Sequence, residues 1–173
     1  MRERSNESGN KTPTSPTSDR HEPAPLNVPI VVDDATLLAI LTSRATAALA
    51  AAGEAGEILT TGSWYYRLHR ALHDPASAGS LTTMVAKLPP AAKDALMVTL
   101  DDLPPEIVVP GPRLLVPMMG ALRLRRRVNH LTAEAIAAAM VSRASIRVTA
   151  DAPLLRVACD ELGIRLDLLA PFA

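Results

Sequence analysis

The side chains in this sequence that are best suited to chemistry are carboxylates at a few turns of the chain. Asp33 and Asp34 follow a short β-branched run, and Asp151 follows a second one. Glu134 lies at the start of an alanine-rich segment. Carboxylate oxygens are hard ligands, which suit Mg²⁺ or Mn²⁺ better than zinc. If these acids meet in space, they form a candidate site for a divalent cation.

Whether the acids meet depends on the elements that carry them. From residue 28 onward, short apolar runs alternate with longer helical patterns. This alternation is typical of a parallel sheet with helices on both faces. We therefore predict an α/β fold with three layers, α/β/α, around a central and mainly parallel sheet. The predicted strands are 28–32, 57–61, 106–109, 145–149 and 164–169. The predicted helices include one that follows the first strand and ends at Gly53, one over 117–128 and one over 133–143.

In such a sheet, binding sites form beyond the carboxyl ends of the strands. Asp33 and Asp34 lie at that end of the first strand, and Asp151 lies at that end of the fourth. Glu134 begins the helix that leads into the fourth strand, so it belongs to the same edge. A second interpretation stands beside this one. Each of these positions also starts a helix, where acids act as caps and interact favourably with the helix dipole without binding a ligand.

Three segments that carry these acids resemble the PIN-domain family. Val31–Leu38 looks like the family's opening, in which a strand ends in Asp and a Leu-rich helix follows. Leu131–Ala139 is similar to its third motif, and Val148–Asp151 resembles its closing Thr-Ala-Asp segment. The likeness extends over about 28–169, and its spacing is closest to the toxin (VapC-type) branch of bacterial PIN proteins.

The resemblance implies a Mg²⁺- or Mn²⁺-dependent RNA endonuclease. In that reading Asp34, Glu134 and Asp151 are the catalytic and metal-binding residues, and Asp33 replaces Asp34 if the register differs by one. The metal lowers the pKa of a bound water and neutralises charge on the attacked phosphate. The partners implied are RNA, an antitoxin-like protein and a second copy of the chain.

The sequence also departs from the family pattern. The family's second acid, a Glu early in the second helix, is missing from 62–68. Glu134 stands where Asp is usual, and 152–155 contain no further acid. A catalytically inactive PIN-like domain that serves as a binding or interaction module is therefore the alternative function, and metal binding distinguishes the two.

Aromatic and basic groups offer weaker indications. Trp64, Tyr65 and Tyr66 stand where the missing acid belongs, and they either pack in the core or stack on a base. The basic residues within 67–73 and 123–127 either contact phosphates or form solvated helix faces.

Composition limits the other function classes. The 18 basic and 18 acidic residues cancel, which excludes a strongly basic nucleic-acid coat. The lone Cys159 excludes an internal disulfide and a Cys-based zinc cluster, and we expect it to be buried. Residues 1–25 lack Leu, Ile, Val and aromatic residues, which predicts a disordered tail before a domain at 26–173. With neither a membrane-spanning run nor a secretory signal, we expect a cytoplasmic protein without membrane contact.

Overall fold

The computed structural model describes residues 28–45, 49, 58–74, 76 and 79–170. Within this part of the chain, five strands form one sheet in the order β3-β2-β1-β4-β5, and all four pairings are parallel. The predicted α/β class and parallel sheet are therefore confirmed. The strands are β1 (Ile30–Val32), β2 (Ile58–Thr60), β3 (Ile107–Val108), β4 (Ser145–Val148) and β5 (Leu166–Leu168).

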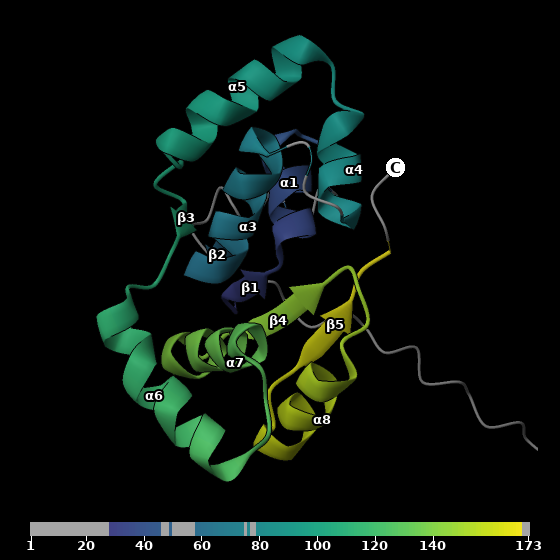
Figure 1. Cartoon of the computed structure of the whole chain (residues 1–173). Coiled ribbons are helices and arrows are strands. Elements are labelled where there is room, and N and C mark those ends of the chain that lie inside the picture. The colour runs from purple at the N-terminus through teal and green to yellow at the C-terminus, as the bar shows by residue number, and fades with distance from the viewer. Residues whose placement is uncertain (1–27, 46–48, 50–57, 75, 77–78, 171–173) are drawn as a thin grey trace, which may run out of the picture.

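Helices lie on both sides of this sheet, as Figure 1 shows. One side is covered by α6, α7 and α8, and the other by α1, α3, α4 and α5. The arrangement has the three layers expected of a strand–helix alternation. The helices are α1 (Asp34–Leu41), α3 (Gly62–His73), α4 (Ser80–Ala86), α5 (Pro90–Asp101), α6 (Pro112–Arg125), α7 (His130–Ser142) and α8 (Pro153–Leu162).

The alternation of side chains along the strands divides the core into two clusters. Val31 and Ile146 pack with the helices of the α7 side, whereas Ile30 packs with those of the α1 side. Successive residues of a strand point to opposite faces, so β1 and β2 each contribute to both clusters. The alanine-rich run of α7 is fully buried, which lets this helix approach the sheet closely.

Short polar side chains fix where three of the helices begin. Asp33 caps α1, Thr61 caps α3 through the N–H of Trp64, and Asn129 caps α7 through the N–H of Thr132. Each cap satisfies a backbone donor that has no partner within its own helix. Since α1 and α3 each begin one or two residues after a strand, the caps also hold these helix starts at the carboxyl edge of the sheet.

Three predicted boundaries were wrong. The first helix was expected to reach Gly53, but α1 ends at Leu41; residues 46–48 and 50–57 lie outside the described part. The helix expected from Pro117 begins at Pro112, because proline is well suited to the first helical position, which needs no N–H donor. The helix expected to start near Ala133 begins at His130, after the Asn129 cap.

The expected disordered tail, 1–25, also lies outside the described residues. None of the described helices combines the length and the apolar character that a membrane crossing requires.

Candidate functional site

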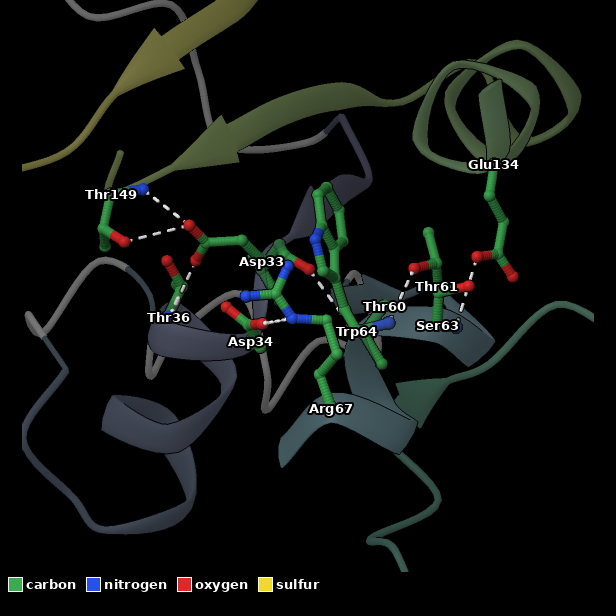
Figure 2. A network of polar contacts seen from close by, with 11 residues as sticks. Asp33, Asp34, Thr36, Thr60, Thr61, Ser63, Trp64, Arg67, Glu134 and Thr149 are labelled. Carbon is green, nitrogen blue, oxygen red and sulfur yellow. Dashed lines mark hydrogen bonds and ion pairs between the residues drawn. The ribbon is translucent and has the colours of Figure 1, made fainter. Parts of the chain in front are cut away.

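Asp33 joins the ends of two neighbouring strands (Figure 2). Its Oδ1 accepts a hydrogen bond of 2.8 Å from the N–H of Thr36, in the first turn of α1. Its Oδ2 accepts two more from Thr149, which follows β4: 2.7 Å from the N–H and 2.9 Å from the hydroxyl. The cap predicted at this turn is therefore Asp33, and this carboxylate is fully engaged in holding β1, β4 and α1 together.

Asp34 faces a different partner, Arg67 of α3. The Nε of Arg67 lies 2.9 Å from the Oδ2 of Asp34, and the carboxylate residue is only 7% exposed. The contact is an ion pair whose geometry is not that of a hydrogen bond, because Oδ2 of Asp34 accepts no hydrogen bond from the described residues. Burial raises the pKa of Asp34 from 3.8 to about 6, although Arg67 lowers it in part and the nearby Asp33 raises it further.

Glu134 lies on the second turn of α7 and not at the helix start, so the predicted capping of its own helix is wrong. Its Oε2 instead accepts a hydrogen bond of 3.2 Å from the N–H of Ser63, at the beginning of α3. A Cβ on Gly62 would lie 3.3 Å from the Oε1 of Glu134, so the two helices approach closely at this glycine. Glu134 thus serves as a cap for a neighbouring helix.

Asp151 points into solvent. Its Oδ1 lies 2.6 Å from the Nη2 of Arg156, one turn along α8, and both side chains are about half exposed. The helix begins after Ala152 and has no side-chain cap, so the prediction that Asp151 caps α8 is wrong. Pro153 at the first helical position fills that turn without needing a donor.

The structure therefore distributes the predicted metal ligands among separate partners. Asp33 and Asp34 line one pocket, whereas Glu134 and Asp151 do not. Among the described residues, no three His, Cys, Asp or Glu side chains gather closely enough to hold a metal ion. A Mg²⁺ ion needs several oxygens around one point. The buried Oδ2 of Asp34 already has the Arg67 guanidinium beside it, so the donor set as arranged does not fit the cation that the resemblance implies.

The pocket at the carboxyl edge has a volume of about 360 Å³. Its polar side is formed by Asp33, Asp34 and Arg67 together with groups near the starts of α7 and α8. Its apolar side comes from four helices, with Trp64 of α3, Leu81 and Met84 of α4, Leu131 of α7 and Leu155 of α8. An apolar pocket with a few placed polar groups is the usual form of a site for a small organic ligand or a nucleobase.

A second hollow continues this pocket along α3 and α4. It has a volume of about 260 Å³ and shares Arg67, Ser80 and Leu81 with the first. Its remaining lining comes from Arg70, Ala71, Gly79 and Thr82. Hydroxyl and guanidinium groups there can donate to an anion such as a phosphate.

Trp64, Tyr65 and Tyr66 are consecutive on α3, so their side chains point in different directions and have different surroundings. Trp64 is buried in the α7-side core and reaches the pocket wall, and the Tyr65 hydroxyl donates to the carbonyl of Leu100. Tyr66 is 63% exposed. Cys159 is fully buried, and burial raises the pKa of its thiol to about 11, so it packs as a small apolar residue as expected.

The pairing of Arg67 with Asp34 was missed in the sequence. Arg67 was grouped with the basic residues of its helix as a phosphate contact or a solvated charge. Arg67 lies in the early part of α3, the helix that follows β2, and β2 pairs with β1. This position is the signal that could have placed Arg67 opposite an acid at the end of β1.

No protein-family model, curated protein or solved structure matches this chain.

Proposed function

We propose that this chain is a PIN-like binding module that holds RNA without a divalent metal. The observation that carries the proposal is the ion pair between Arg67 Nε and Asp34 Oδ2 at 2.9 Å. Asp34 is the carboxylate that the resemblance assigns to the metal, and a side-chain cation lies beside it instead. A guanidinium can attract and orient a phosphate, but it does not generate a hydroxide from bound water as a metal does.

The shape and chemistry of the two adjoining hollows support RNA as the ligand. The larger one offers an apolar wall of sufficient size for a base. The smaller one offers Arg67, Arg70 and the hydroxyl residues of α4 to the adjacent phosphate. Arg67 lines both hollows. It therefore lies between the place proposed for the base and the place proposed for the phosphate of one nucleotide.

The remaining acids support a binding role over catalysis. Glu134 is engaged with the N–H of Ser63, and Asp151 is engaged with Arg156 in solvent. The second helix carries no acid in its first turn. In the pocket, a catalytic ion would therefore find Asp33 engaged in three hydrogen bonds and Asp34 beside a competing cation.

The test is binding of a fluorescein-labelled single-stranded RNA oligonucleotide, followed by anisotropy in EDTA and again in Mg²⁺. We expect the same affinity in both, and a loss of about tenfold in Arg67→Ala because a charged contact to phosphate is removed. Arg165→Ala is the matched control, since Arg165 is an exposed arginine with its own ion pair to Asp167.

Two results would contradict this function in different ways. Mg²⁺-dependent cleavage of the RNA that disappears in Asp34→Asn would show a nuclease. Binding that is as strong in Arg67→Ala as in the wild type would place RNA elsewhere on the surface. Calorimetry with Mn²⁺ completes the test, and we expect no saturable heat at micromolar concentrations of the ion.

A further inference from the structure

We propose a second binding surface between the end of α6 and the outer side of α8, which docks an acidic amphipathic helix of a partner protein. The surface is a hollow of about 440 Å³. It shares no lining residue with the pocket at the carboxyl edge. In Figure 1 the segment that leaves α6 passes beside α8 before α7 begins. The lining residues are Arg125, Arg126, Arg127, Val128, Leu154, Val157, Ala158 and Glu161.

The floor of the hollow is apolar and unusually exposed. Leu154 and Val157 lie one turn apart on α8 and are 54% and 56% exposed. Leu124, on the last turn of α6, directly precedes the lining segment without lining the hollow itself, and it is 90% exposed. Single exposed apolar residues are ordinary, but a group of them around a concavity marks an interaction site. The spacing of Leu154 and Val157, one helical turn, matches the spacing of apolar residues along one face of a partner helix.

The rim of the hollow is strongly basic. Three consecutive arginines face one glutamate, and that glutamate is already paired with Arg126. In the described part of the chain, Arg125 and Arg127 form no ion pair. Two unpaired guanidinium groups beside an apolar floor are complementary to a ligand that carries carboxylates next to apolar side chains.

The apolar floor and the basic rim together indicate which kind of molecule fits the hollow. RNA would use the arginines but would leave Leu154 and Val157 exposed, since they offer no hydrogen bonds to a backbone. A second copy of the same surface would bring arginines against arginines, which is unfavourable. An anionic membrane is flat and does not fill a concavity. A helix with leucines on one side and glutamates along its flanks satisfies both the floor and the rim.

The probe for this surface is a synthetic helical peptide with leucines on one face and glutamates on both flanks. Its counterpart has lysine in place of every glutamate. We expect the acidic peptide to bind the full chain by fluorescence anisotropy and the lysine peptide not to bind. Leu154→Ser combined with Val157→Ser should weaken binding about tenfold, because these residues form the centre of the apolar contact.

Matched variants distinguish binding at this surface from non-specific binding elsewhere on the protein. Val98→Ser changes a 71% exposed residue on α5 and should leave binding unchanged. Arg125→Glu with Arg127→Glu should reverse the preference in favour of the lysine peptide, whereas Arg113→Glu at the start of α6 should not. All these positions are exposed, so the fold tolerates the changes.

Several outcomes would overturn the proposal. These are no binding of the acidic peptide, equal binding of both peptides, or binding that the Leu154 and Val157 changes do not affect. Binding of phosphatidylserine vesicles that requires these residues would assign the surface to a membrane. Sedimentation of the wild type as a dimer that the same changes dissociate would assign it to a second copy.

Discussion

Two adjacent carboxylates at the end of β1 have opposite roles because their surroundings differ. Asp33 accepts three hydrogen bonds, which fix the start of α1 against Thr149. Asp34 is equally buried, and the Arg67 ion pair with backbone N–H groups at the start of α1 offsets only part of the loss of hydration. The cost of burying its charge is therefore incompletely compensated, and burial raises its pKa to about 6.

This raised pKa makes folding stability depend on pH. Native Asp34 holds its proton up to pH 6 or so, whereas an unfolded aspartic acid releases it near its ordinary value of 3.8. Between these values the native state binds more protons, so the free energy of unfolding falls as pH rises. We expect Asp34→Asn to lack this fall. The wild type should lose about 3 kcal/mol relative to the variant between pH 3 and pH 7.

Urea unfolding of both proteins at several pH values measures this difference. Asp94→Asn, which changes an exposed carboxyl on α5, is the control and should follow the wild type. A constant difference between wild type and Asp34→Asn across the whole range would mean that Asp34 ionises normally, with Arg67 compensating its burial in full.

At the scale of elements, the junction of α3 and α7 is the feature most easily mistaken for a metal site. Glu134 of α7 accepts a hydrogen bond from the first turn of α3, where unpaired N–H groups and the helix dipole favour a negative charge. Gly62 allows the carboxylate to come this close. The acid therefore has a structural use that needs no cation.

Replacement of Glu134 tests this use. Glu134→Ala should lower the free energy of unfolding by about 1–2 kcal/mol, because the partly buried N–H of Ser63 loses its acceptor. Glu134→Gln retains an acceptor oxygen and should lose less. Gly62→Ala should be better tolerated in the Glu134→Ala background than in the wild type. Chemical denaturation of the four variants gives these values, with Glu106→Ala as an exposed control; equal stability of wild type and Glu134→Ala would exclude the capping role.

At the scale of the whole molecule, the sheet order gives the strands unequal protection. β1 has a parallel neighbour on each side, and β4 lies next to it. β3 and β5 occupy the edges, and every described residue of β5 is at least partly exposed. Local opening is easiest where few buried contacts and few shared hydrogen bonds hold an element.

Hydrogen exchange can detect this gradient. We expect the amides of β1 and β4 to exchange only through global unfolding, and those of β5 to exchange at least about tenfold faster through local opening. Exchange of all five strands at one rate would instead indicate a sheet that opens only as a single unit. NMR-detected exchange under native conditions distinguishes these cases strand by strand.

The sequence by itself determined the strands, the fold class and the edge at which the acids lie. Periodicity and β-branched runs report local backbone preference and burial, and these were sufficient to predict all five strands within a few residues. Only the tertiary structure decided the partner of each acid. The contact of Asp34 with Arg67 joins residues 33 positions apart, and that of Glu134 with Ser63 joins residues 71 apart. A side chain's partner depends on distances across the sheet, which no local pattern encodes.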